Sequence, residues 1–153
     1  MQMRRFWEDV YPYHLITTIK GGARILSDPQ RAKFIQDYLL EARRRDDIML
    51  LAYCIMPEHV HICMAPRKKD PSIFMMNLKL MCVSRFKLGS IWEKRFFDKR
   101  INSLKKLNNT VEYIHNNPVE AGYVEKPEQW KYSSAGHWEE LDYNIVIEYG
   151  TDV

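Results

Sequence analysis

Two histidines separated by one residue are the clearest chemical signal in this sequence. His59 and His61 stand in the run MPEHVHI, with Val60 between them. Successive side chains of a β-strand point to opposite faces, so both imidazoles are predicted to project from one face. Neutral imidazoles are common ligands of divalent metals, and the pair predicts half of a metal site. The alternative is that an isolated pair of this kind is structural.

A second polar pair lies on a predicted helix. Tyr113 and Asn117 are four residues apart and therefore share a helical face. At about 100° per residue, both lie off the apolar stripe, whereas His115 lies near it and is predicted to pack. Asn116 is predicted to cap the helix. The stripe follows helical spacing at Leu104, Leu107, Val111 and Ile114.

A phenol, an amide oxygen and two imidazoles are the groups needed for metal-assisted attack on a phosphodiester. Cys63 shares the predicted face of the histidines and raises zinc as an alternative. Strand rise, however, separates His59 from Cys63 by about 13 Å, and no CxxC pair completes a zinc ligand set. Two imidazoles, one amide oxygen and open positions suit Mg²⁺ or Mn²⁺ bound together with a phosphate.

Periodicity and turn residues predict the elements that would position these groups. Asp28 and Ser103 are predicted helix N-caps, and Pro118 is predicted to end the last helix. The helix from residue 71 is apolar nearly all round, which predicts deep burial or a covering partner. Strands are predicted at 13–19, 48–55, 59–64 and 90–101, with helices at 29–45, 71–88 and 104–117. This order predicts an α+β ferredoxin-like sandwich, with a four-stranded antiparallel sheet and helices on one face.

Length and composition suit a single domain. The 153 residues are 46% hydrophobic, and no stretch approaches the roughly 20 apolar residues of a membrane span. The N-terminus lacks an apolar secretory core, so we expect no membrane association and a cytoplasmic location. The three cysteines are odd in number and lie in apolar surroundings, which argues against a disulfide framework. We expect one domain over 1–153, with a core of about 10–136 and an acidic extension at 138–153.

Basic residues are concentrated in the middle of the chain. Residues 67–106 hold 12 Lys and Arg against 3 Asp and Glu, a balance of +9 in a chain of net charge +3. Aromatic residues interleave with them, which is typical of a nucleic-acid surface, although a solvated charged surface would look the same. Trp92 and Phe96 are candidates for base stacking. Candidates for phosphate contacts are Lys79, Arg85, Lys87, Lys94, Arg95 and Lys99.

Taken together, these motifs resemble those of the single-tyrosine HUH transposases (the IS200-like superfamily). His59-Val60-His61 corresponds to the His-hydrophobe-His motif, and Tyr113 with Asn117 corresponds to the tyrosine helix. MPEHVH, W-x-x-R-F at 92–96, YIHNNPVEAG at 113–122 and YSS at 132–134 resemble the REP-associated tyrosine transposase branch. The resemblance covers about residues 10–136. Two residues depart from the resemblance. The branch often has Asn at the position of Glu58 and Leu at the position of Tyr123.

The resemblance implies an HUH endonuclease fold and a metal-dependent enzyme that nicks and joins single-stranded DNA at hairpins. Tyr113 would be the nucleophile and form a 5′-phosphotyrosine link, while His59, His61 and Asn117 would bind the metal. The expected source is a bacterium or archaeon, with the protein associated with the nucleoid. The resemblance fits either a monomer or a homodimer. The alternative is a domesticated, catalytically silent transposase that binds structured DNA or RNA. The acidic extension is predicted to restrain DNA binding or to form an edge strand.

Overall fold

Four antiparallel strands form one sheet in the computed structural model, which describes residues 11–142. The strands are β1 (Tyr13–Thr18), β2 (Ile48–Ile55), β3 (His59–Pro66) and β4 (Phe97–Arg100), in the spatial order β2-β3-β1-β4. The hairpin predicted around Pro57 and Glu58 joins β2 to β3, and Met56 N–H donates to the His59 carbonyl at 2.8 Å. The expected α+β class with an antiparallel sheet is confirmed.

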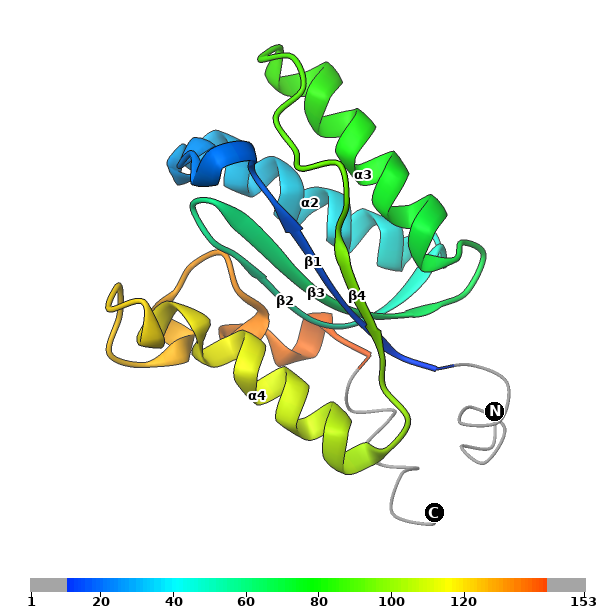
Figure 1. Cartoon of the computed structure of the whole chain (residues 1–153). Coiled ribbons are helices and arrows are strands. Elements are labelled where there is room, and N and C mark those ends of the chain that lie inside the picture. Colours follow the sequence, from blue (N-terminus) through cyan, green and yellow to red (C-terminus); the bar gives the residue numbers. More distant parts are fainter. Residues whose placement is uncertain (1–10, 143–153) are drawn as a thin grey trace.

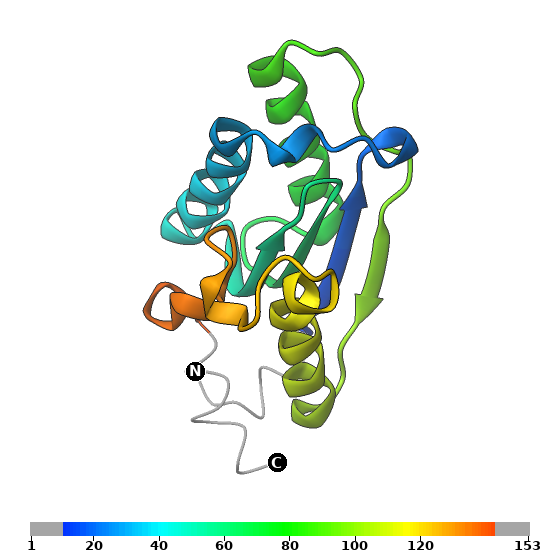
Figure 2. The same ribbon diagram turned by 90° about the vertical axis from the view of Figure 1, so that its left-hand side faces the viewer.

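Helices cover both faces of this sheet. α2 (Pro29–Arg44) and α3 (Pro71–Phe86) lie on one face, and α4 (Leu104–Glu120) lies on the other (Figure 1). Figure 2 shows the same separation from a view turned by 90°. The prediction that all helices share one face is therefore wrong for α4. All eight residues of β2 are buried, so both of its faces need apolar cover, and α4 supplies the second.

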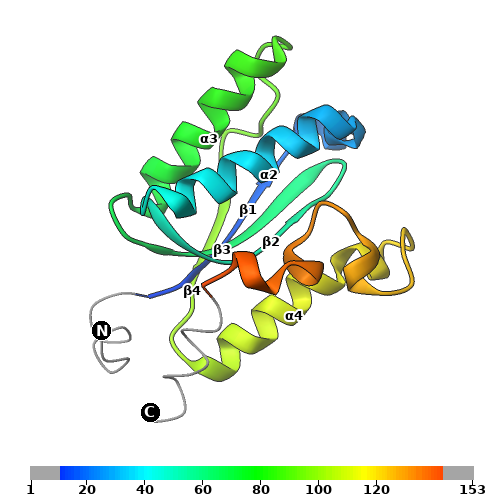
Figure 3. The same ribbon diagram turned by 180° about the vertical axis from the view of Figure 1, so that it is seen from behind.

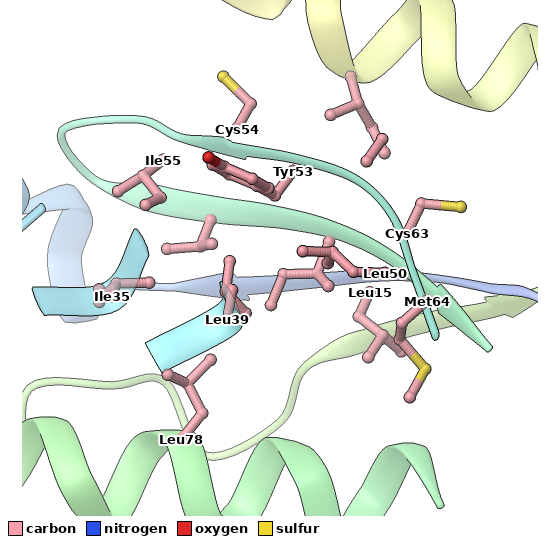
Figure 4. Packing of buried hydrophobic residues seen from close by; sticks show 14 of the residues in the cluster. Leu15, Ile35, Leu39, Leu50, Tyr53, Cys54, Ile55, Cys63, Met64 and Leu78 are labelled. Carbon is pink, nitrogen blue, oxygen red and sulfur yellow. The ribbon is translucent and has the colours of Figure 1, made fainter. Parts of the chain in front are cut away.

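The core side chains divide between the two faces. Figure 4 shows Leu15, Leu50 and Met64 directed toward α2 and α3, and Cys54 and Cys63 on the opposite side of the sheet. These cysteines are buried free thiols, as is the third, and burial raises the pKa of Cys54 to about 12. They act as small apolar core residues.

No helix within residues 11–142 is long and apolar enough to span a membrane.

The predicted N-caps are confirmed for the two helices on which they were assigned. The Asp28 carboxylate accepts a hydrogen bond from Gln30 N–H at 2.9 Å at the start of α2. The Ser103 hydroxyl accepts one from Lys106 N–H at 3.1 Å at the start of α4. Each side chain satisfies a backbone donor that lacks a partner within the helix, which fixes where the helix begins.

Two predicted boundaries of the C-terminal half are wrong. α4 continues past Pro118 to Glu120, because proline in the last turn removes only one hydrogen bond and Ala121 N–H still reaches the Asn117 carbonyl at 3.0 Å. Asn116 is accordingly not a cap, and its amide donates to Glu120 at 3.2 Å. β4 begins at residue 97 rather than 90, since the preceding segment meets the sheet only through a bridge between Trp92 and Ile19.

Helix α3 is not deeply buried, although its apolar composition predicts burial. It contacts the sheet and α2 through one stripe, formed by Phe74, Met75, Leu78 and Cys82. Its other face carries exposed apolar side chains, 44–60% accessible, at Ile73, Met76, Leu80 and Met81. An apolar sequence on every side therefore does not mean burial on every side within this chain, and the covering partner that the composition also predicts stays a prediction.

The segment after α4 covers the outer edge of β2 (Figure 3). Ile55 N–H donates to the Tyr132 carbonyl at 2.8 Å, and Leu50 N–H donates to the Asp142 carboxylate at 2.9 Å. Asp142 also pairs with Arg43 at 3.2 Å, so the start of the acidic extension belongs to the fold. The edge strand predicted at 143–149 lies outside the described residues, and restraint of DNA binding by the extension stays a prediction.

Ser134 links this covering segment to β2 and α4. Its hydroxyl accepts from Tyr53 N–H at 2.9 Å, lies 3.2 Å from the Tyr53 carbonyl, and is 2.7 Å from His115 Nε2. All of these groups are buried. Burial also lowers the pKa of His115 to about 4, so this imidazole is neutral at pH 7.

We expect Ser134→Ala to lower the free energy of unfolding by about 2–4 kcal/mol. The change leaves a buried N–H and a buried imidazole unsatisfied, each at a cost of about 1–3 kcal/mol. Urea unfolding followed by circular dichroism measures the difference. Ser72→Ala is the matched control, because Ser72 is exposed and its loss should change stability by less than about 0.5 kcal/mol. Equal unfolding midpoints for the two variants would contradict the role of Ser134.

Candidate active site

Two imidazoles converge on the sheet face that α4 covers. His59 and His61 project from β3 on the same side, as strand alternation predicts, and their Nε2 atoms are 3.0 Å apart. His61 is 2% exposed, whereas His59 is partly accessible. One imidazole of the pair is therefore buried, and the other is partly accessible to solvent.

Each of these imidazoles has a side-chain partner at its outer nitrogen. The Glu58 carboxylate lies 3.0 Å from His59 Nδ1, and His14 Nε2 lies 3.0 Å from His61 Nδ1. Burial, with smaller contributions from neighbouring imidazoles, lowers the pKa of His61 to about 3. Burial and the nearby Lys99 lower the pKa of His14 to about 4. Both rings are neutral at pH 7, as metal binding by imidazole requires.

The spacing of the two Nε2 atoms fits a small divalent cation. Two ligand atoms in adjacent octahedral positions, each about 2.1 Å from Mg²⁺, are about 3.0 Å apart. The observed separation is also 3.0 Å. Within residues 11–142, one cluster of three side chains that could ligate a metal has its ligand atoms within 4.8 Å of one another, namely His137, Glu139 and Glu140. That cluster lies on the surface and includes none of the residues predicted to bind the metal.

Helix α4 places a tyrosine beside the imidazoles. The Tyr113 side chain is 57% exposed, and its ring centroid lies 5.7 Å from that of His61 and 6.0 Å from that of His14. Asn117 lies one turn further along α4, half-buried, with no side-chain hydrogen bond to any described residue. His115 points inward to Ser134, as predicted. The helix thus presents a phenol to the site and keeps an amide available one turn away.

His14 is the residue of this cluster that sequence patterns did not identify. It lies on β1, where its Cα pairs with that of Cys63, so it shares the sheet face of the two histidines. Its ring is 5.6 Å from that of Phe97, which is 48% exposed at the start of β4. Alternation along residues 13–18 places His14 on one face of its strand, but only the pairing of β1 with β3 brings it to His61.

The predicted DNA contacts separate into three groups. Lys99 pairs with His14 across β1 and β4 and therefore lies on the face of the site. Lys94 and Arg95 are exposed on the segment before β4. Arg85 and Lys87 are exposed at the end of α3, on the opposite face of the sheet from α4. The basic middle of the sequence is thus not one continuous surface.

Lys79 and Trp92 make contacts within the fold, while their predicted DNA contacts stay predictions. Lys79 Nζ donates to the Glu93 carbonyl at 3.0 Å and lies 5.5 Å from the centre of the Phe96 ring, and burial lowers its pKa. It holds the segment before β4 against α3. Trp92 is only 5% exposed, so its ring has no free face on which a base could stack. Phe96 remains half-buried under Lys79.

Comparison with known proteins agrees with this geometry. The model of the family described as "Transposase IS200 like" matches residues 8–117, which include β1, the two histidines and Tyr113. The chain belongs to the IS200-like transposase family. The match includes every residue of the site described above, from His14 to Asn117.

Individual relatives point to one branch of the family. A Haemophilus influenzae protein, provisionally named a REP-associated tyrosine transposase, is 28% identical over 75% of this chain and 80% of its own. The REP-associated tyrosine transposase of Escherichia coli is 27% identical over 67% of this chain and 63% of its own length. The structure of a REP-associated tyrosine transposase bound to a REP hairpin superposes with a TM-score of 0.71 at 22% identity, covering 82% of this chain and 77% of the other.

Proposed function

We propose that this transposase nicks and rejoins single-stranded DNA next to a hairpin, with Tyr113 as the nucleophile. The observation that carries the proposal is the position of the Tyr113 ring, 5.7 Å from the ring of His61, whose Nε2 lies against that of His59. A solvent-accessible phenol next to a pair of imidazoles supplies both an attacking oxygen and ligands for a cation.

The chemistry is an exchange of phosphoester bonds. The Tyr113 oxygen bonds to the scissile phosphorus as the bond from phosphorus to the 3′ oxygen breaks. The phenol proton passes to water, and the departing 3′ oxygen takes up a proton, which leaves a 3′-OH and a 5′-phosphotyrosine. Attack by a 3′-OH on that phosphorus reverses the exchange and rejoins a strand. One phosphoester replaces another at each step, so no external energy source is needed.

His59, His61 and Asn117 would hold Mg²⁺ or Mn²⁺ at this site. When bound, such an ion polarises the scissile phosphate as a Lewis acid. The 3.0 Å separation of the two Nε2 atoms and the unengaged amide of Asn117 support this ligand set. Glu58 and His14 occupy the outer nitrogens and leave both Nε2 atoms for the ion.

The proposed DNA surface lies around the open side of the site. Phe97 is an exposed aromatic ring at the site and takes the stacking role predicted for Trp92. Lys99 supplies a cation beside His14, and Lys94 and Arg95 extend the basic surface. The relative whose structure contains a REP hairpin supports hairpin DNA as the substrate.

Tyr113→Phe is expected to abolish the covalent protein–DNA adduct while leaving hairpin binding within about twofold, because only the hydroxyl is lost. A denaturing gel with a labelled single-stranded oligonucleotide that includes a hairpin measures the adduct. Tyr123→Phe is the matched control and should form the adduct at the wild-type rate. Adduct formation by the Tyr113→Phe variant would assign the nucleophile elsewhere. No adduct from the wild-type protein, with hairpin binding intact, would favour a catalytically silent binding protein.

His59→Ala and His61→Ala are each expected to abolish adduct formation and to reduce Mn²⁺ affinity below detection by titration calorimetry. Excess chelator should stop the wild-type reaction, and added Mg²⁺ or Mn²⁺ should restore it. His137→Ala serves as the control, because it removes a histidine from the exposed cluster and should leave affinity and activity unchanged. Cleavage that persists in chelator would rule out the metal mechanism.

Lys99→Met is expected to weaken hairpin binding and to lower the slope of log affinity against log salt by about 0.7–0.9, the value for one phosphate contact. Arg85→Met removes the same charge on the other sheet face and should leave the slope unchanged. Fluorescence anisotropy across a salt series measures both. Equal slope changes for the two variants would show that binding responds to overall charge and not to a surface at the site.

A further inference from the structure

A third imidazole lies behind the proposed metal ligands and takes no part in the proposed reaction. His14 is 8% exposed in the middle of the sheet. Its Nε2 lies 3.0 Å from Nδ1 of His61, the nitrogen that points away from His59. The planes of the two rings differ by only 22°, with centroids 5.3 Å apart. Such near-parallel rings allow a hydrogen bond between ring nitrogens that lies close to both planes.

We infer that His14 is a positioning residue, which fixes the tautomer and ring orientation of His61 by accepting a hydrogen bond from its Nδ1. The inference rests on the proposed function, since it assigns His61 Nε2 to the metal. It adds a residue from β1 to a site otherwise built from β3 and α4. His14 would contact neither the ion nor the DNA.

The tautomer follows from the two neighbours of the His61 ring. A neutral imidazole carries one hydrogen, and the nitrogen that binds a metal must be the other one. When His61 Nε2 and His59 Nε2, which lie 3.0 Å apart, both bind a cation, the hydrogen of His61 belongs on Nδ1. His61 is 2% exposed, and a buried N–H without an acceptor is costly. His14 Nε2 is the acceptor at hydrogen-bond distance.

The backbone and neighbouring rings hold His14 in place. β1 pairs with β3 on one side and with β4 on the other, so the strand that carries His14 is central in the sheet. The rings of Phe97 and Tyr113 approach His14 edge-on, at centroid distances of 5.6 Å and 6.0 Å. One ring therefore contacts a proposed ligand and the proposed nucleophile, so that a shift of His14 would move both.

Two other roles for His14 fit the geometry less well. It is not placed as a third ligand, because its Nε2 faces the outer nitrogen of His61 and not the point where the two ligand atoms converge. It could instead be a base for the Tyr113 hydroxyl, but the two rings meet edge to face and no hydrogen bond joins their side chains within the described part of the chain. These roles predict different responses to substitution.

Three substitutions separate the roles. His14→Gln places an amide oxygen near the position of Nε2 and keeps an acceptor. His14→Asn places its amide one bond short of that position, and His14→Phe keeps a flat ring without an acceptor. Outer partners of ligating histidines typically contribute about 10- to 100-fold to metal affinity. We expect the Phe and Asn variants to lose Mn²⁺ affinity by that factor and the Gln variant to stay within about threefold of wild type.

Titration calorimetry with Mn²⁺ on the full-length protein measures affinity, and thermal unfolding confirms that each variant is folded. The rate of adduct formation at saturating Mn²⁺ provides a second readout. If His14 acts through His61, high Mn²⁺ should restore the rate of the Phe variant. A rate that stays low at every Mn²⁺ concentration would assign His14 to proton transfer and overturn the inference, as would wild-type affinity in a folded Phe variant.

Long-range proton–nitrogen NMR of the wild-type protein, recorded without DNA both at saturating Mg²⁺ and without metal, tests the tautomer directly. At saturating Mg²⁺ the expected spectrum has the His61 hydrogen on Nδ1, and a hydrogen on Nε2 would overturn the inference. This measurement also separates two failures. A wild-type protein with the Nδ1 hydrogen that binds no Mn²⁺ would contradict the proposed metal site while leaving the interaction between His14 and His61 intact.

Discussion

The antiparallel pairing of β1 with β3 is the constraint on which the site depends. Its register sets His14 opposite Cys63 and Ile16 opposite His61, so the three imidazoles of the site project toward α4. A slip of one residue in either strand would turn its side chains to the other face and remove the imidazoles from the site. The apolar residues of the same strands, packed against α2 and α3, make that slip costly, so core packing and site geometry are enforced together.

Burial of both sheet faces has a further chemical consequence. Because α4 and the segment after it cover the face that carries the imidazoles, His61 and His14 lose most of their contact with water, and their pKa values fall to about 3 and about 4. Neutral imidazole is the form that binds a cation, so burial keeps His61 in the form that the proposed metal site needs. The hydrogen-bonding cost of burial is met by Glu58 and His14 at the outer nitrogens.

How much of this could be predicted depends on whether a feature is local in sequence. The shared face of His59 and His61 follows from strand alternation, and that of Tyr113 and Asn117 from helical spacing. His14 could not be found this way, because its contact with His61 spans 47 residues and depends on strand register. The side of the sheet on which α4 lies was missed for the same reason. The burial of Trp92 could not be predicted, because aromatic and basic residues alternate in both DNA surfaces and packed loops.

The site also combines two opposite requirements, and its elements divide them. Metal ligands gain from burial and fixed orientation, which a central strand such as β3 provides. A nucleophile that must reach the phosphate of a polymer needs open space, and Tyr113 is 57% exposed on the outer part of α4, while His61 is 2% exposed. Phe97 is exposed as well, and both its ring and that of Tyr113 contact the ring of His14. In the proposed reaction, a DNA strand that contacts Phe97 and Tyr113 would meet the buried histidines only at its backbone, so base identity would be recognised at the rim of the site.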